Sequence, residues 1–278
     1  MEVPLKINNM EKRDFNKGNK DILEDKIVTE DTPKMNYLFG MHPVFEAIQA
    51  GKKIDKVLVK KGLDGAQFYE LITLMQDNNI PFQFVPVERL NRVTKGKHQG
   101  VIALMSSIDY ISLEDAIEGA LKRSPNPLIL MLDGVSDVRN FGAIARTAEC
   151  AGVSCIILPA KGGASITPDS IKTSAGALVR IPVCRVPNLK TAAFYLLQSD
   201  FQLVAATEKA TGDIYSADFT RATAIVMGSE DKGISDGIRA LATQEVKIPM
   251  MGAIGSLNVS VAGAIVLYEA VRQRVDAK

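Results

Sequence analysis

Cysteine, histidine and tryptophan are scarce in this 278-residue sequence, which contains no tryptophan at all. The three cysteines are Cys150, Cys155 and Cys184. Their odd number and the lack of C-x-x-C spacing argue against a disulfide framework and favour the reducing cytoplasm as the location. Since His42 and His98 are the only histidines, a His/Cys metal cluster is also disfavoured, and we expect no bound metal.

Long hydrophobic runs are absent as well. No apolar stretch approaches the ~20 residues that a membrane-spanning helix needs, and the polar N-terminus lacks the core of a signal peptide. Hydrophobic residues make up 46% and charged residues 23% of the chain, which is typical of a globular protein. We therefore expect no association with a membrane.

The signatures of several common α/β enzymes are missing. No G-x-G-x-x-G follows the strand that we expect at 128–132, and no G-x-x-x-x-G-K-[ST] occurs, which disfavours an ordinary dinucleotide enzyme and a P-loop NTPase. A G-x-S-x-G elbow is also absent, which disfavours an α/β hydrolase.

The charge of the chain is nearly balanced, with a net charge of +1, but it is unevenly distributed. Residues 37–106 carry nine basic and six acidic side chains, a surplus that weakly supports a polyanionic partner. The candidates for phosphate contacts are Lys60, Lys61, Arg89, Arg92, Lys95 and Lys97, although each one singly is more often a solvated surface charge.

The pattern of the chain predicts a tail and two globular parts. Residues 1–36 are polar and carry few apolar side chains, so we expect a disordered tail. Residues 37–106 alternate short strands and helices and predict a small α/β domain, followed by a linker at 107–125. Strands and helices also alternate over 126–278, which predicts an α/β fold with a mostly parallel sheet and helices on both faces.

Several local predictions can be checked against the structure. We expect Asn140 to cap a helix that runs to Glu149, and Ser256 to cap a long helix over 257–274. A single helix is expected at 169–178, and Phe82 and Phe84 are expected in a core. The long helix places Leu257, Val261, Ile265, Tyr268 and Val271 on one side, which serves either as core or as a dimer interface.

Three polar, glycine-containing motifs follow apolar, strand-like runs. They are Asn140-x-Gly142-x-x-x-Arg146, Gly228-Ser-Glu230-x-x-Gly233 and Ile248-Pro-Met-Met-Gly-Ala-Ile-Gly-Ser256-Leu-Asn258. Open α/β sheets build their sites at the carboxyl ends of strands, and a guanidinium near a helix N-terminus suits an anion. Taken singly, each motif also has a plain structural explanation as a helix cap or a turn.

Taken together, the order and residues of these motifs resemble the SpoU/TrmH class of the SPOUT superfamily, the knotted RNA ribose 2′-O-methyltransferases. The resemblance covers residues 126–278. A weaker likeness in the small domain, in Gly40-x-His42-x-Val44 and His98-Gln-Gly100-Val, is to the substrate domain of the bacterial large-subunit ribosomal RNA guanosine methyltransferases.

The resemblance implies a parallel sheet with a C-terminal trefoil knot, preceded by a ribosomal-protein-like RNA-binding domain. It implies S-adenosylmethionine as the cofactor, ribosomal RNA as the partner and a homodimer with the site near the subunit interface. Catalysis and RNA placement are implied for Arg146, Asn140, Glu230, Asn258 and Ser256. Cofactor contacts are implied for Gly228, Ile248, Leu257, Thr207, Met227 and Ser229.

The reaction so implied needs a ribose hydroxyl to lose its proton while a methyl group moves from a good leaving group. The family assigns the base to the matching arginine, whereas a guanidinium with a pKa above about 12 rarely deprotonates. We therefore also consider that Arg146 binds a phosphate and stabilises the alkoxide, with Glu230 orienting Arg146 or Asn140. Methylation of transfer RNA and a non-catalytic RNA-binding factor of the same fold are the alternatives.

Overall fold

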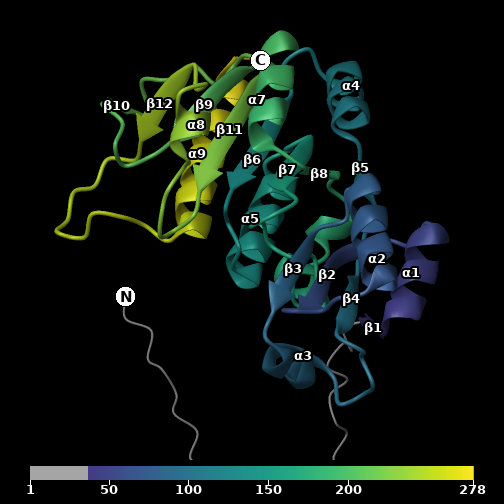
Figure 1. Ribbon diagram of the computed structural model, residues 1–278. Helices are drawn as coiled ribbons and strands as arrows, with labels where there is room; N and C mark the ends of the chain where they lie inside the picture. The colour runs from purple at the N-terminus through teal and green to yellow at the C-terminus, as the bar shows by residue number, and fades with distance from the viewer. Residues whose placement is uncertain (1–36, 278) are drawn as a thin grey trace, which may run out of the picture. The chain divides into compact units, whose positions relative to one another are not determined.

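The computed structural model describes residues 37–277, so the tail predicted at 1–36 lies outside the described residues. Two sheets organise the described chain, one of four strands and one of eight (Figure 1). The eight-stranded sheet pairs all of its strands in parallel, as the alternation of strands and helices predicted.

The four-stranded sheet has the order β1-β4-β2-β3 and is antiparallel except for the parallel pair β2 and β3. Helices α1 and α2 pack on one face of it, and α3 packs on the other through Leu90. The elements are β1 (Tyr37–Phe39), α1 (Met41–Gln49), β2 (Ile54–Lys60), α2 (Ala66–Asp77), β3 (Phe82–Val85), α3 (Val87–Val93) and β4 (Val101–Met105). The short elements β1 and α3 were not predicted.

The eight-stranded sheet has the order β10-β12-β9-β11-β6-β7-β8-β5. Its first half comprises β5 (Tyr110–Ile111), α4 (Leu113–Arg123), β6 (Leu128–Asp133), α5 (Val138–Cys150), β7 (Cys155–Pro159), α6 (Pro168–Thr173), β8 (Val183–Val186) and α7 (Leu189–Gln198). Its second half comprises β9 (Gln202–Ala206), β10 (Gly212–Asp213), β11 (Thr223–Gly228), α8 (Asp236–Arg239), β12 (Gln244–Lys247) and α9 (Val259–Asp276). The two-residue strands β5 and β10 had no sequence signal.

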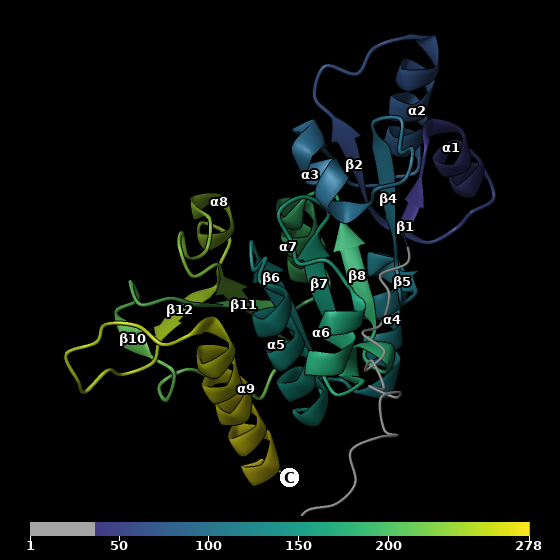
Figure 2. The ribbon, with the colours of Figure 1, turned by 90° about the horizontal axis from the view of Figure 1, so that it is seen from below.

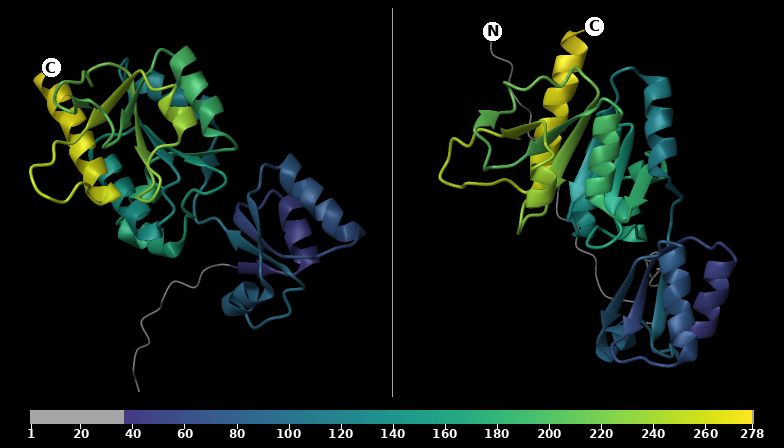
Figure 3. Two further views of the ribbon diagram at one scale, coloured as in Figure 1. Left: turned by 60° about the vertical axis from the view of Figure 1, so that its left-hand side comes forward. Right: turned by 45° about the horizontal axis from the view of Figure 1, so that its top comes forward.

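Both faces of this sheet are covered by helices, which explains its continuous apolar strands. Leu128, Leu130 and Leu132 face a core shared with α5 and α9, while Ile129 and Met131 face a second core shared with α4, α7 and α8. Figures 2 and 3 show α5 and α9 together on one side of the sheet and α7 on the other. Every strand of the sheet centre is therefore buried on both faces.

Two predicted helix caps are wrong. Helix α5 begins three residues earlier than expected, because Asp137 accepts hydrogen bonds from the backbone N–H groups of Arg139 and Asn140. Helix α9 is capped by Asn258, whose Oδ1 accepts from the N–H of Ser260, and not by Ser256. The side chain of Asn140 is thereby released from capping and becomes free for other contacts.

Two further expectations need correction. The helix predicted at 169–178 is broken into α6 and a short 3₁₀ turn at Ala177–Val179, since Ala175 and Gly176 adopt positive φ angles. Phe84 is 45% exposed and lies outside the core, whereas Phe82 packs partly against it. The two rings meet edge to face at 5.8 Å, so Phe84 is held by a neighbouring ring on the surface.

The apolar side predicted for the last helix is only partly exposed. Helix α9 buries Val259, Val266, Leu267 and Ala270, while Val261 and Tyr268 of the predicted side are exposed. None of the helices in the described part of the chain combines the length and hydrophobicity that a bilayer crossing requires. The two alternatives left open from the sequence, core or interface, therefore divide this side of the helix: Ile265 packs against the core, whereas Val261 and Tyr268 stay exposed.

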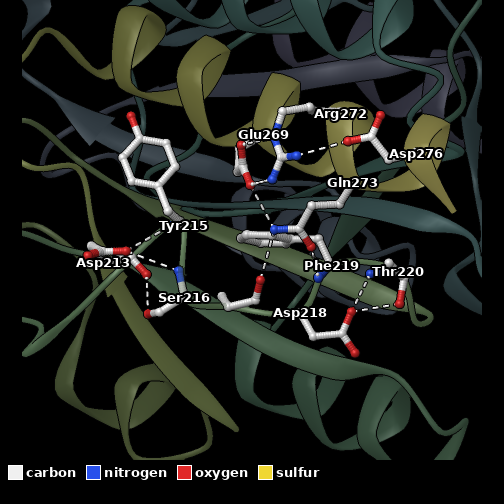
Figure 4. A network of polar contacts seen from close by, with 11 residues as sticks. Asp213, Tyr215, Ser216, Asp218, Phe219, Thr220, Glu269, Arg272, Gln273 and Asp276 are labelled. Atoms are coloured by element: carbon white, nitrogen blue, oxygen red, sulfur yellow. Dashed lines mark hydrogen bonds and ion pairs between the residues drawn. The ribbon is translucent and has the colours of Figure 1, made fainter.

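A polar network fastens the end of α9 to the segment that precedes β11 (Figure 4). The buried carboxylate of Glu269 accepts hydrogen bonds from Arg272 and Gln273. Gln273 in turn donates to the carbonyl of Ala217 and accepts from the N–H of Phe219, at 2.9 and 2.8 Å. These bonds satisfy backbone groups of a loop at the sheet edge and fix the end of the helix against it.

Candidate functional site

The three motifs meet at the carboxyl end of the parallel sheet. Asn140 lies in the first turn of α5, which follows β6, and Glu230 follows β11, the neighbour of β6. Asn258 stands at the start of α9, after β12. Because the carboxyl ends of parallel strands share one edge of the sheet, segments up to 118 residues apart come together there.

Asn140 joins the other two side chains by hydrogen bonds. Its Nδ2 donates to Oε1 of Glu230, and its Oδ1 accepts from Nδ2 of Asn258 at 3.2 Å. Both ends of the Asn140 amide are therefore engaged, which fixes its orientation. The row Asn258–Asn140–Glu230, hereafter the polar row, links one residue from each of the three motifs.

The loop that carries Glu230 is rigidly closed. Ser229 and Gly233 exchange two backbone hydrogen bonds, and the N–H of Ser235 donates to Oδ2 of Asp133 at 2.8 Å. The returning chain passes so close to Gly228 that a Cβ atom there would lie 2.1 Å from the carbonyl carbon of Gly233. The glycine is thus required by a backbone crossing, which holds Glu230 at a set place.

Arg146 stands apart from the polar row. It lies on the exposed side of α5, six residues after Asn140 and therefore about 9 Å further along the helix. Within residues 37–277 its guanidinium has neither an ion pair nor a hydrogen bond to another side chain. The charge of Arg146 is consequently available to an anionic ligand.

Gly142 serves packing in this structure. A Cβ atom at Gly142 would lie 2.7 Å from the Cβ of Thr173 and 2.9 Å from the carbonyl oxygen of Ser170. The close approach suggested by this glycine is therefore made by helix α6, and no ligand need be invoked for it.

A cavity of about 490 Å³ lies beside the polar row. Its wall includes Ser256 and Leu257, the two residues immediately before Asn258. The predicted cofactor residues Thr207, Met227, Ile248 and Leu257 line the cavity, whereas Gly228 and Ser229 do not. Ser256, predicted among the catalytic residues, lies at this cavity and outside the polar row.

Sequence reasoning missed several residues of the site. Asp137 and Asp133 do not touch the cavity, but they fix the start of α5 and the loop of Glu230. Glu208 and Ala262 line the cavity. Only Asp137 had a readable signal, since aspartate is one of the residues preferred at the N-cap of a helix.

The two cavity residues that were missed, Glu208 and Ala262, come from different elements. Glu208 follows β9, and Ala262 lies on α9. Met227, Val246 and Leu257 supply an apolar surface, and the volume falls within the usual range for small-molecule sites, about 300–1,000 Å³. Glu208, Lys247 and the hydroxyl residues Thr207 and Ser256 add polar groups to this wall, and such a mixed lining suits a flat heterocycle joined to polar groups.

Two family models match the chain. The model of the SpoU rRNA Methylase family matches residues 127–268, and the model for RNA 2′-O ribose methyltransferase substrate binding matches residues 37–111. The first match includes the whole polar row and the whole cavity wall. The second includes the complete four-stranded sheet.

Individual relatives are similar over most of the chain. YacO of Bacillus subtilis, described as of the TrmH family of tRNA/rRNA methyltransferases, is 31% identical over 239 residues, which cover 86% of this chain and 96% of YacO. A TrmH-family relative from Staphylococcus aureus is 33% identical with the same coverage. The crystal structure of the SpoU methyltransferase AviRb from Streptomyces viridochromogenes, in complex with the cofactor AdoMet, is 25% identical, with a TM-score of 0.55 over 87% of this chain and 92% of that one.

Proposed function

Because the chain belongs to the SpoU rRNA methylase family, whose members are RNA methyltransferases that use S-adenosylmethionine, we propose that it methylates a ribose 2′-hydroxyl of structured RNA. The preferred substrate is a guanosine of large-subunit ribosomal RNA. The observation that carries the proposal is the polar row, which begins at Asn258 directly after the cavity residues Ser256 and Leu257. A donor in the cavity and a sugar at the row would be neighbours.

The cavity fits S-adenosylmethionine. Met227, Val246 and Leu257 offer an apolar slot for the adenine, and the Glu208 carboxylate can accept hydrogen bonds from ribose hydroxyls. When bound, this cofactor supplies a methyl group activated by a sulfonium. Leu257→Ala should weaken its binding about tenfold by calorimetry. Ile254→Ala is the matched control, because Ile254 lies in the same loop but outside the cavity wall.

The polar side chains would orient the RNA sugar and stabilise charge. Glu230 accepts from Asn140, so its proposed role is to orient Asn140, whose amide positions the ribose. Arg146 would bind an RNA phosphate and stabilise the negative charge that develops on the 2′-oxygen. Replacing Arg146 by Lys should lower kcat about a hundredfold if the bidentate guanidinium matters. Near-normal turnover of Arg146→Lys would exclude that role.

A homodimer is part of the proposal. Exposed apolar side chains gather along the loop before α9 and on the outward side of α9, and they are Met250, Met251, Ile254, Leu257, Val261, Tyr268 and Val275. On α9 the three exposed residues recur every seven positions, which places them on one stripe. A second copy of the chain would cover this stripe, and its Arg146 could reach the polar row from across the interface.

The same proposal assigns a function to each part of the chain. We assign RNA binding to residues 37–106, a linker to 107–125, and S-adenosylmethionine binding with a C-terminal trefoil knot to 126–278. The presence of the four-stranded sheet favours ribosomal RNA. Transfer RNA remains the second candidate, since the relatives are described as tRNA/rRNA methyltransferases.

The decisive experiment maps ribose methylation by mass spectrometry in ribosomal and transfer RNA from cells with and without the gene. The proposal expects one 2′-O-methylguanosine of large-subunit RNA to disappear and to return with the wild-type gene but not with Asn140→Ala. Loss of a transfer-RNA methylation would select the second candidate. Unchanged RNA, together with no binding of S-adenosylmethionine by calorimetry, would instead indicate a non-catalytic RNA-binding factor.

A further inference from the structure

A buried ion pair joins the four-stranded sheet to the eight-stranded one. Arg185 of β8 contacts Asp55 of β2 at 2.8 Å, and their side chains are only 9% and 1% exposed. The Asp55 carboxylate also accepts from the hydroxyl of Tyr110 at 2.6 Å and from the N–H of Ile166 at 3.2 Å. Arg185 further donates to the carbonyl of Ala164. A buried pair with this many hydrogen bonds holds a fixed geometry.

This pair forms part of the wall of a groove of about 500 Å³, hereafter the basic groove. Lys56 and Arg89 enter it from the four-stranded part, and Lys161 enters it from the loop after β7. Asp55 is the one carboxylate among the described residues that line the groove, and Arg185 neutralises it. Three positive charges therefore face the groove without a counterion from its wall.

The charges of the basic groove repel one another. Burial lowers the pKa of the Lys56 ammonium. The negative charge of Asp55 raises this pKa, and the positive charges of Arg89 and Arg185 lower it. Lys161 has no carboxylate partner among residues 37–277, and its Nζ lies 5.8 Å from the centre of the Phe82 ring. Bringing like charges together is unfavourable unless an anion binds between them.

A buried donor at the groove has no partner. The Nε of Arg185 makes no hydrogen bond within the described residues, although nine-tenths of the side chain is buried. Buried donors are nearly always satisfied, and an unsatisfied one calls for a ligand or water. Oδ2 of Asp55, an acceptor, is unpaired in the same way, so this buried pair suits a ligand that both accepts and donates hydrogen bonds, as the phosphates and hydroxyls of a ribose–phosphate backbone do.

The groove reaches the start of the helix that carries Asn140. Ser136 and Val138 line it, and they flank Asp137, the cap of the helix that carries Asn140. An extended chain of regularly spaced anions could therefore continue from the α5 N-terminus into the groove.

We propose that the basic groove binds the sugar–phosphate backbone of the RNA strand next to the nucleotide held at the polar row, with Lys56, Arg89 and Lys161 contacting phosphates. This inference rests on the proposed function and adds where the strand runs. The contacts carry no base information, so they contribute affinity to every RNA sequence alike. The four-stranded part and the eight-stranded part then grip one strand jointly.

The test compares two double variants of the full-length protein. The double variant Arg89→Gln with Lys161→Gln, hereafter the groove pair, removes two exposed charges of the groove. The double variant Lys52→Gln with Lys122→Gln, hereafter the control pair, removes two exposed charges outside the groove. Lys52 lies just before β2, and Lys122 lies on α4. Binding of a fluorescent fragment of large-subunit ribosomal RNA and of bulk transfer RNA is measured between about 50 and 200 mM salt.

The groove pair should bind both RNAs roughly tenfold more weakly, and the slope of log affinity against log salt should fall by about 1 for each lost charge. S-adenosylmethionine affinity should stay within about twofold of wild type, since neither side chain lines the cofactor cavity. Arg89→Lys with Lys161→Arg keeps the charge and should restore binding.

The outcomes separate the groove from the proposed function. If the groove pair binds RNA as tightly as the control pair does, the groove assignment is wrong, and the proposed methyltransferase function is unaffected. If the wild-type protein binds S-adenosylmethionine but no RNA of either kind, both proposals fall together. A groove pair that also loses S-adenosylmethionine would mean a general structural defect and would overturn the assignment as well.

Discussion

The polar row and the basic groove differ in how their side chains are held. In the row, Asn140 has both ends of its amide engaged by neighbouring side chains, and the loop of Glu230 is closed by backbone bonds. In the groove, Lys161 and Arg89 are exposed and have no carboxylate partner in its wall. Chemistry on one sugar oxygen needs fixed geometry, whereas attraction of a polyanion needs only charge.

The difference leads to unequal sensitivity to substitution. Residues of the row act as a unit, so loss of one member should abolish most of the activity. Cations of the RNA-binding surface act additively, so each single loss should be small. The following predictions test that contrast, beginning with the strongest effect.

Substitution of Asn140 by Ala should lower kcat by about a hundredfold to a thousandfold, because it leaves both Glu230 and Asn258 without their shared partner. S-adenosylmethionine affinity should change little, since Asn140 does not line the cavity. Single-turnover methylation and calorimetry measure the two quantities. Asn188→Ala, which removes a helix cap on α7, is the control and should leave kcat unchanged. Equal rates for the two variants would contradict the central role of Asn140.

Substitution of Gly228 by Ala should destabilise the protein by about 3 kcal/mol, because a Cβ would overlap the backbone of Gly233 and Ile234. It should also displace the loop of Glu230 and reduce the rate. Urea unfolding measures the free energy. Gly252→Ala is the matched control, since nothing lies within 4 Å of a Cβ there. If both alanines are tolerated alike, the backbone crossing at Gly228 is looser than described.

Substitution of Tyr268 by Glu should dissociate the proposed dimer by placing a charge on the exposed stripe of α9, at a loss of about 2 kcal/mol in association. Sedimentation velocity over a range of concentrations measures the dimer. Phe194→Glu on α7 removes a ring of equal exposure, 52%, from a different face and should leave the dimer intact. A wild-type protein that sediments as a monomer would contradict the dimer outright.

Substitution of Glu269 by Gln should destabilise the protein by about 1 kcal/mol at neutral pH. Hydrogen bonds from Arg272 hold the pKa of Glu269 below its usual value against the effect of burial, and Gln273 lowers it further. A lowered pKa means that the ionised carboxylate stabilises the fold above about pH 4.5 and loses this effect as pH falls through the folded-state pKa. Urea unfolding at pH 7 and pH 3 should therefore show the difference from wild type shrinking in acid, with the exposed Glu149→Gln unchanged at both.

Substitution of Lys60 by Gln alone should have the smallest effect, about twofold to threefold in RNA affinity at physiological salt. Lys60 is exposed at the end of β2 and lies outside the basic groove. Titration of labelled ribosomal RNA measures it, beside Lys122→Gln. A loss as large as that of the groove pair would show that single cations dominate binding, which would remove the contrast between the two regions.

Much of the architecture was readable from the chain. Apolar runs at 128–132 and 202–206 predicted buried strands, and the alternation with helices predicted the parallel sheet. The prediction of helix starts was poorer, because Asp137 and Asn140 are both good caps and only the folded chain chooses between them. The break after α6 had one signal that was not used, Gly176 inside the predicted helix, whereas the positive φ of Ala175 cannot be read from an alanine.

The amino-acid sequence by itself determined which residues are polar at strand ends, and so which three motifs carry the candidate chemistry. Only the tertiary structure decided that Asn140 stands between Glu230 and Asn258, that α9 turns Tyr268 outward, and that Arg185 pairs with Asp55. The physical reason is that the spacing of apolar residues indicates which face of a helix or strand is buried, but not which segment it packs against. Partners that lie 90 to 130 residues apart are brought together by packing of the sheet edge, on which local pattern carries no information.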